Sequence, residues 1–329
     1  MVRNRSQRMS QHPFRSGALA FALIATGSLA HAAQAPADYI YTSAGDFAEH
    51  QHYLARADIE GVQIVYNWKQ LERGQGEYDF SRIDADLKQV ERLHKKLFIQ
   101  IQDRFFEPGA RNIPAYLLTD PAFGGGLVAQ IDNPGENKPP ASGWATQQWN
   151  PEVRARFQKL LQALAARYDG RIQGINLPET AIDIDYKRDK TSFTCDKYFA
   201  AEMENLAAAR HAFKQSHVVQ YVNFWPCEWN NDHDYMGRLF EYAAKHGVGL
   251  GGPDIVPYKK GQMKNAYPFF HRYREQLSLV AMAVQEPTLT YNNDKTGKPF
   301  TREEFSAFAQ DYLGADIIFW TVSAPWLNP

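Results

Sequence analysis

Eight short runs of β-branched, aromatic and other apolar residues recur along the chain, and helical patterns lie between them. This alternation indicates βα units, because consecutive parallel strands need a crossover connection that is usually a helix. Eight strands with seven intervening helical segments predict an α/β fold, a single (β/α)8 or TIM barrel. A doubly wound sheet shares the pattern, but no glycine-rich phosphate loop follows the first run, which disfavours its dinucleotide-binding form. The eight runs are 38–42, 62–68, 97–103, 172–179, 218–225, 248–255, 277–286 and 315–322.

Capping signals support the helical segments between these runs. Asn150 followed by Pro151 is a typical helix start, and Thr301 with Glu304 forms a capping box. The chain ends soon after the eighth run, so we expect the eighth helix of the barrel to be lacking or truncated. The connection 104–149 is long, contains Pro, Gly and Asn and shows little periodicity, so we expect a functional loop there.

The first 32 residues have the pattern of a secretory signal peptide. Four arginines and no acidic residue precede the apolar run 18–29, and small residues follow it. We expect cleavage after Ala32, which leaves 33–329 as the barrel domain and makes the protein secreted or periplasmic. No second apolar segment is long enough to cross a membrane, so no membrane association is expected after cleavage.

Charge and cysteine content exclude several classes of protein. Lys and Arg number 36 against 37 for Asp and Glu, so the basic excess typical of a nucleic-acid-binding protein is missing. Two cysteines cannot build a Cys-rich metal cluster. Cys195 and Cys227 follow consecutive predicted strands and would meet an oxidising compartment after export, so we expect a disulfide between them.

Two glutamates end strongly apolar runs. Glu179 ends the fourth run and Glu286 the seventh, and the carboxyl ends of barrel strands are where active sites lie. By two-residue alternation Leu177 lies on the same face as Glu179, and Val284 on the same face as Glu286. If those apolar faces point into the barrel, both carboxylates project near its axis. Two facing carboxylates, one protonated and one ionised, are the chemical groups that hydrolyse glycosidic bonds.

The seven tryptophans also gather at one end of the predicted barrel. Trp68, Trp225 and Trp320 end the second, fifth and eighth runs, and the other four lie in loops that follow the third, fifth and eighth. Amphipathic aromatic rings at one rim suit stacking against the apolar faces of sugar rings. The residues that we expect to bind substrate are Trp68, Asn176, Asn223, Trp225, Tyr258 and Trp320.

Spaced motifs over most of the mature chain resemble the clan A glycoside hydrolases. The stretch 61–72, GVQIVYNWKQLE, with GEYDF at 76–80, is similar to the clan's opening motif, as are IPAYL at 113–117 and YDGRIQGI at 168–175. These enzymes are retaining (β/α)8 glycosidases. The resemblance implies Glu179 as acid/base, Glu286 as nucleophile and Trp320 as the platform under the cleaved sugar. The sequence departs from the clan at Pro178, where an Asn usually precedes the acid/base, and Asn176 lies two residues earlier.

The predicted function is therefore a retaining glycosidase that acts on a β-linked poly- or oligosaccharide, without a cofactor or metal. A non-catalytic sugar-binding barrel is the alternative, and a metal-dependent barrel hydrolase is a weaker one. His50 and His52 resemble a metal-binding pair, but no downstream His set completes it. The sugar, the linkage and endo or exo action stay open at this point.

Overall fold

A computed structural model describes residues 35–131 and 143–328. By its contacts the chain divides into units 1–33 and 34–329, and all described residues belong to the second. The expected signal peptide and its cleavage site after Ala32 lie outside the described residues. No helix in the described ranges combines the length and the apolar character that a membrane span needs.

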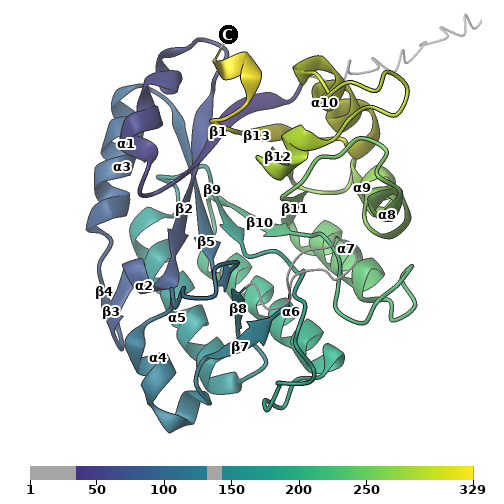
Figure 1. Ribbon diagram of the computed structural model, residues 1–329. Helices are drawn as coiled ribbons and strands as arrows, with labels where there is room; N and C mark the ends of the chain where they lie inside the picture. Colours follow the sequence, from purple (N-terminus) through teal and green to yellow (C-terminus); the bar gives the residue numbers. More distant parts are fainter. Residues whose placement is uncertain (1–34, 132–142, 329) are drawn as a thin grey trace, which may run out of the picture. The chain divides into compact units, whose positions relative to one another are not determined.

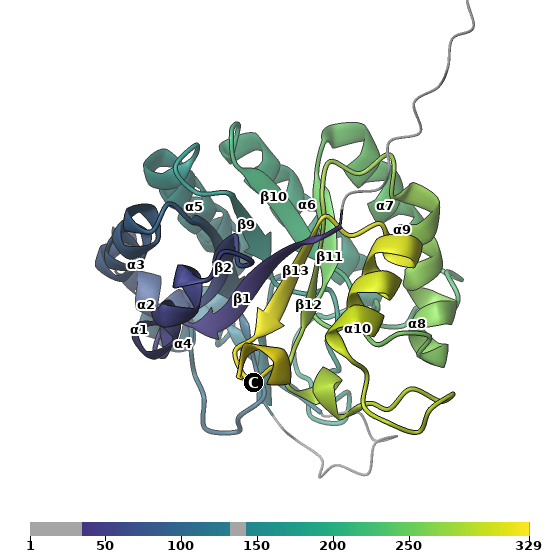
Figure 2. The ribbon, with the colours of Figure 1, turned by 90° about the horizontal axis from the view of Figure 1, so that it is seen from above.

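The eight predicted strands form a closed parallel barrel, as the alternating pattern indicated (Figures 1 and 2). Around the barrel the order is β1-β13-β12-β11-β10-β9-β5-β2, and β1 pairs with β13 to close the ring. The strands are β1 (Ala37–Ser43), β2 (Gly61–Asn67), β5 (Lys96–Gln102), β9 (Gly174–Leu177), β10 (His217–Tyr221), β11 (Gly249–Gly252), β12 (Val280–Val284) and β13 (Ile317–Thr321).

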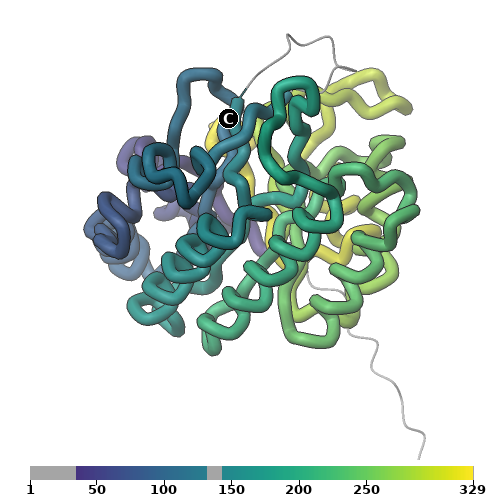
Figure 3. Tube along the Cα trace, turned by 90° about the horizontal axis from the view of Figure 1, so that it is seen from below, coloured from purple at the N-terminus to yellow at the C-terminus, as the bar shows by residue number. Residues whose placement is uncertain are grey.

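Helices surround the strands on the outside, and α5 and α6 lie side by side there (Figure 3). Asn150 caps α5 through its side chain, and Thr301 with Glu304 forms the expected capping box of α10. After β13 the described residues include a 3-10 turn at Pro325–Leu327. The helices are α1 (Phe47–His50), α2 (Trp68–Leu71), α3 (Ser81–Arg92), α4 (Ala115–Thr119), α5 (Pro151–Tyr168), α6 (Cys195–Ala212), α7 (Tyr235–His246), α8 (Lys260–Asn265), α9 (Tyr267–Tyr273) and α10 (Arg302–Phe308).

Large aromatic rings fill the inside of the barrel. Tyr39, Phe98 and Phe319 meet edge to face, with ring centroids 5.2–6.0 Å apart. Residues beside them must be small: a Cβ on Gly61 would lie 2.3 Å from the ring of Tyr39, and one on Gly251 would lie 1.8 Å from a backbone oxygen of β12. The barrel interior is therefore a packed core below the mouth.

This packing corrects the expected direction of two strands. Ala281 and Ala283 of β12 belong to the interior cluster, whereas Val280, Met282 and Val284 pack outward with the helix layer. In β9, Ile175 and Leu177 also face outward. Both faces of these buried strands are apolar, so alternation alone does not tell which of them points to the axis.

The connection 104–149 is not the irregular loop that the sequence suggested. Strands β6 (Arg104–Phe105), β7 (Leu127–Gln130) and β8 (Gly143–Thr146) form a small antiparallel sheet in the order β6-β8-β7. Helix α4 precedes a turn in which Gly124, Gly125 and Gly126 all have positive φ. Strands of two to four residues are too short to show a periodicity in the sequence.

The predicted disulfide is confirmed. Cys195, the first residue of α6, is bonded to Cys227 in the loop after β10, with a Cα–Cα distance of 6.2 Å. The bond ties together the segments that follow β9 and β10, the two strands whose ends border the site described next.

Candidate active site

A cavity of about 570 Å³ opens at the carboxyl ends of β9, β10, β11 and β12. The small sheet of the 104–149 insertion supplies one wall, and the segments after these strands supply the others. Its polar lining combines carboxylates, amides and one lysine, with several aromatic and apolar side chains between them. The lining residues are Phe106, Gln130, Ile131, Glu179, Ala181, Ile182, Asp183, Asn223, Phe224, Pro253, Asp254, Val256, Lys259, Gln262, Gln285, Pro287 and Tyr291.

Glu179 lies in this cavity, two residues beyond the end of β9. Burial raises the pKa of its carboxyl from 4.5 to about 7, while the charge of Arg104 and a hydrogen bond with Asn223 act in the opposite direction. The nearby charges of Asp254 and Asp103 raise the pKa further. A carboxyl with a pKa near neutral can hold a proton at pH 7 and can also release it, which is what a general acid/base requires.

Glu286 lies beside the cavity at the barrel mouth, two residues beyond β12, and it is exposed. Its neighbours Gln285 and Pro287 line the cavity, while its own carboxylate accepts hydrogen bonds from the hydroxyls of Thr321 and Ser323. Because Thr321 is paired with inward-facing Tyr41, these bonds hold the carboxylate at the top of β13.

Tyr41 connects the carboxylates electrostatically. Burial raises the pKa of the Tyr41 hydroxyl to about 12, and the charges of Glu286, Asp254 and Glu179 add to the shift, in that order. One phenol thus lies within the field of all three carboxyl groups, so the three belong to the same mouth of the barrel.

Asp254 is a third carboxylate that the sequence analysis missed. It lines the cavity with Glu179 and lies two residues beyond β11, the same offset as Glu179 and Glu286 from their strands. Thr288 donates a hydrogen bond to its Oδ1 at 2.9 Å, and Tyr267 donates one to its backbone oxygen at 2.8 Å. The sixth apolar run, 248–255, continues past Asp254, whereas the strand itself ends at Gly252.

Gln130 is a second residue that the sequence did not reveal. Its side chain is 3% exposed and lines the cavity from β7, and its Nε2 has no hydrogen-bond partner among the described residues. An unpaired buried amide costs free energy unless a ligand or water completes it. Gln130 therefore offers a hydrogen bond to whatever fills the cavity.

Of the predicted substrate-binding residues, Asn223 lines the cavity. Its Oδ1 accepts a hydrogen bond of 2.6 Å from Gln262, and both side chains line the cavity. Asn176 is fully buried inside the barrel, level with Gln100 and Val219 on the neighbouring strands, and is not among the lining residues. Tyr258 is 64% exposed and packs edge-on against Phe308, outside the cavity lining.

The three strand-end tryptophans lie in the core, and their burial does not favour the predicted stacking on substrate. Trp68, Trp225 and Trp320 are each at most 2% exposed. Trp225 packs between Phe199 and Tyr198 at ring distances of 4.9 and 5.9 Å. Trp320 faces the helix layer, where it meets Trp326 edge-on at 5.4 Å. Each of these side chains points away from the barrel axis. Its position in the in-and-out alternation of the strand, or in the turn after the strand, directs it outward.

Trp68 also explains part of the sequence motif. Its indole Nε1 donates a hydrogen bond to Glu72 Oε2 at 2.7 Å, and the backbone N–H of Gly76 donates to Glu72 Oε1 at 2.8 Å. Arg156 on α5 pairs with the same carboxylate at 2.6 Å. The spacing of Trp68, Glu72 and Gly76 is thus a structural requirement of the segment after β2.

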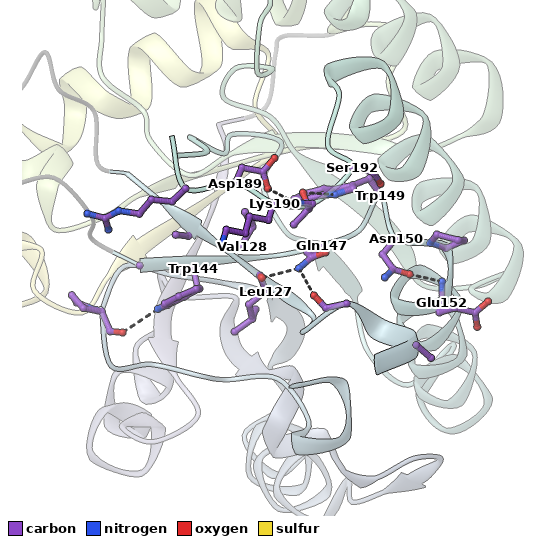
Figure 4. Close-up of a pocket in the computed structure, with 18 residues that line it drawn as sticks. Leu127, Val128, Trp144, Gln147, Trp149, Asn150, Glu152, Asp189, Lys190 and Ser192 are labelled. Carbon is purple, nitrogen blue, oxygen red and sulfur yellow. Dashed lines mark hydrogen bonds between the residues drawn. The ribbon is translucent and has the colours of Figure 1, made fainter. Parts of the chain in front are cut away.

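A second, larger cavity of about 820 Å³ lies beside the small antiparallel sheet (Figure 4). Trp144, Trp149, Gln147 and Asn150 line it, and each of these side chains already has a hydrogen-bond partner in the protein. Glu179, Asp254 and Gln130 are not among its lining residues. The smaller cavity is therefore the better candidate for an active site.

In the described ranges, no three His, Cys, Asp or Glu side chains lie close enough together to hold one metal ion. His52 instead pairs through Nδ1 with the backbone oxygen of Glu49 and packs on Tyr53.

Solved structures share this fold at low sequence identity. The catalytic domain of β-amylase from Paenibacillus polymyxa is 10% identical with a TM-score of 0.57, over 88% of this chain and 92% of that chain. A psychrophilic glycoside hydrolase family 10 endo-β-1,4-xylanase is 11% identical with a TM-score of 0.52, over 88% of this chain and 87% of that chain. A xylanase from Paenibacillus barcinonensis is 11% identical with a TM-score of 0.50, over 86% and 84%.

Fold and site together define the class: a (β/α)8 barrel whose mouth, in the described residues, holds the carboxyl groups of Glu179, Asp183 and Asp254 in one cavity and that of Glu286 beside it. No protein-family profile matches the sequence, and no curated protein matches it significantly. At 10–11% identity the solved structures establish the fold that this chain shares with them and nothing finer.

Proposed function

We propose that this protein is a retaining glycoside hydrolase of a β-linked poly- or oligosaccharide, with Glu179 as acid/base and Glu286 as nucleophile. The observation that carries the proposal is the state of Glu179: a carboxyl with a pKa of about 7 in a cavity at the carboxyl ends of the strands, beside other carboxylates. The fold is also that of proteins named as xylanases and a β-amylase, which act on glycans.

The proposed reaction has two balanced steps. First, a carboxylate oxygen of Glu286 forms a bond to the anomeric carbon, the glycosidic C–O bond breaks, and Glu179 gives its proton to the leaving oxygen. Then Glu179 takes a proton from water, the water oxygen bonds to the anomeric carbon, and the ester bond to Glu286 breaks. The second step returns to Glu179 the proton that it gave up in the first step, so the enzyme ends unchanged.

The amides around Glu179 suit a sugar ligand. Gln130, Asn223, Gln262 and Gln285 present donors and acceptors that match hydroxyl groups, and Tyr291 and Phe224 supply aromatic surface. The unpaired Nε2 of Gln130 gains a partner when a hydroxyl binds. Three carboxyl groups and one lysine line the cavity, so it disfavours an acidic glycan and can accept a neutral one.

Asp254 is a second candidate for the nucleophile, favoured by the finding that it lines the cavity with Glu179 while Glu286 lies at its edge. Glu286→Gln and Asp254→Asn separate the two assignments. The nucleophile's variant should lose turnover by about 10³-fold or more while it still binds glycan, and the other variant should retain measurable turnover.

The decisive experiment assays residues 33–329, purified without the expected signal peptide, against a panel of plant, microbial and host β-glycans. NMR of the first product should show retention of the anomeric configuration. Glu179→Ala should spare substrates with a good leaving group, and added azide should restore part of the lost rate. Glu303→Gln, at an exposed position on α10, is the matched control and should match wild type.

Two outcomes would overturn the proposal. Glycan binding without hydrolysis would identify a non-catalytic sugar-binding barrel, and activity that chelator removes would identify a metal-dependent hydrolase. We also expect export, and the disulfide between Cys195 and Cys227 is compatible with an oxidising compartment. Detection of the protein in periplasm or medium, beginning after Ala32, tests this part.

A further inference from the structure

A buried charged cluster lies close enough to Glu179 to act on its carboxyl group. Asp103, the residue after β5, and Arg104, the first residue of β6, meet Tyr198 and Glu202 of α6, and all four are at most 4% exposed. A fully buried guanidinium is rare in proteins, because its desolvation is costly unless its charge is used. The two-carboxylate mechanism leaves this arginine unexplained.

Hydrogen bonds connect Arg104 to the backbone that carries Glu179. Arg104 Nη2 donates to the Tyr198 hydroxyl at 2.7 Å, and that hydroxyl donates to the backbone oxygen of Thr180 at 3.0 Å. Thr180 is the residue after Glu179, and its own hydroxyl donates to Phe224 O at 2.8 Å. The turn with Glu179 is therefore held by Tyr198 and by the segment after β10.

The charge of Arg104 is only loosely neutralised. Its nitrogens lie 3.9 Å from Asp103 Oδ1 and 3.8 Å from Glu202 Oε1, and its Nε and Nη1 have no hydrogen-bond partner among the described residues. Burial raises the pKa of Asp103, and it raises the pKa of Glu202 to about 8, so the two acids are not both ionised near neutral pH. Positive charge thus remains available to Glu179, whose pKa it lowers.

We propose that Arg104 is a positioning residue for Glu179: it holds the turn that carries the carboxyl through Tyr198 and Thr180, and it stabilises the carboxylate once the proton has left. This inference rests on the proposed role of Glu179 as acid/base.

The proposed reaction explains why such a group is needed. Glu179 must be protonated when the glycosidic bond breaks and ionised when water attacks. Desolvation, Asp254 and Asp103 all favour the protonated form, and Arg104 is the nearby cation that favours the ionised one. Among the described residues, the other charged or titratable groups around the cavity are Tyr41, Asp183, Tyr198, Glu202, Lys259, Glu286 and Tyr291.

The test measures the titration of Glu179 itself. Carbon-13 NMR of glutamate-labelled protein, with the signal assigned by its loss in Glu179→Gln, gives the pKa without any substrate. Arg104→Gln should raise the pKa of Glu179 by about one pH unit or more, the size expected for loss of a close opposite charge. Tyr198→Phe keeps the charge but removes both hydrogen bonds, so it should leave the titration in place and lower kcat more than it changes KM.

Two further variants guard against misfolding and non-specific effects. Arg104→Gln combined with Glu202→Gln removes the cation with an adjacent acid, so it buries less uncompensated charge, and it should raise the Glu179 pKa as well. Arg188→Gln, an arginine whose side chain is 69% exposed, should leave both readouts unchanged.

An unaltered Glu179 titration in folded Arg104→Gln and in the double variant would overturn the inference. Failure of the proposed function has a different signature: wild type would then hydrolyse no glycan, while the NMR titration would still report the effect of Arg104. An activity loss in Tyr198→Phe with equal changes in kcat and KM, and with a lower melting temperature, would show a merely structural role for the tyrosine.

Discussion

Trp320 in the last barrel strand donates a hydrogen bond from its indole Nε1 to Asp38 Oδ1 in the first strand, at 2.5 Å. Arg302 of α10 contacts the other oxygen of the same carboxylate at 2.5 Å. The pair spans the seam at which β13 meets β1, and Phe305 and Trp326 pack on the indole. Trp320 therefore helps to close the barrel, and its indole is buried at 1% exposure.

Replacement of Trp320 by Phe should destabilise the protein and spare substrate binding. The variant loses the bond to Asp38 and part of the packing against Trp326, which together are worth about 1–3 kcal/mol. Urea unfolding should show the lower stability, and KM for any glycan that is cleaved should stay within twofold. A raised KM at unchanged stability would mean that Trp320 contacts the sugar after all.

Glu179 should lower stability at neutral pH, because its pKa is about 7 in the native protein and 4.5 ordinarily. Below the lower value both folded and unfolded states are protonated. As pH rises between the two values the unfolded state ionises first, so wild type loses stability, and above the higher value the loss stays constant. Glu179→Gln does not ionise and avoids this loss.

The stability advantage of Glu179→Gln over wild type should therefore grow by on the order of 1–3 kcal/mol between about pH 4 and pH 8. Chemical unfolding at several pH values measures it. An advantage that does not depend on pH would show that the Glu179 carboxyl is not shifted upward in the native state.

Asp254→Asn should lower the pKa of Glu179, because the negative charge of Asp254 favours the protonated form of its neighbour. The high-pH limb of the activity profile should move to lower pH by up to about one pH unit. Thr288→Val is the matched control, since it removes the 2.9 Å hydrogen bond but keeps the charge. A shift of equal size in Thr288→Val would assign the effect to geometry instead of charge.

Gln130→Leu should weaken substrate binding with little loss of stability, because Nε2 of the buried amide has no hydrogen-bond partner among the described residues to lose. We expect KM to rise about five- to tenfold, the usual worth of one hydrogen bond. Gln147 directly follows β8 of the same small sheet, and its amide already donates to Leu127 O, so Gln147→Leu should instead reduce stability and leave KM unchanged. The opposite pattern would exclude Gln130 from the binding site.

Removal of the disulfide by Cys195→Ser with Cys227→Ser should reduce stability by about 3–4 kcal/mol, from the loop-closure entropy of a separation of 32 residues. Urea unfolding of the variant and of wild type, each with and without reductant, measures the change. Reductant should lower the midpoint of wild type alone. Equal midpoints in all four samples would show that the bond does not contribute.

The sequence was sufficient for those features that depend on order along the chain. Eight apolar runs separated by helical patterns predicted a closed barrel, and the positions of Glu179 and Glu286 after the fourth and seventh strands followed from the same pattern. Cys195 and Cys227 were placed after consecutive strands, which lie side by side in such a barrel, so their pairing was also predictable. Capping at Asn150 and Thr301 is local and needed no tertiary information.

Tertiary structure alone decided which face of each strand points to the axis. Strands in a parallel barrel are apolar on both faces, so alternation in the sequence defines two faces but does not tell which one points to the axis. The face that points inward is the one on which Tyr39, Phe98 and Phe319 pack against glycine and alanine of neighbouring strands. Trp320 and Val284 lie on the opposite face and therefore point outward. Asp254, Gln130 and Arg104 approach Glu179 only because strands distant in sequence close into one ring. Such proximity produces no repeating pattern in the sequence, because it depends on packing between segments and not on the spacing of residues within one segment.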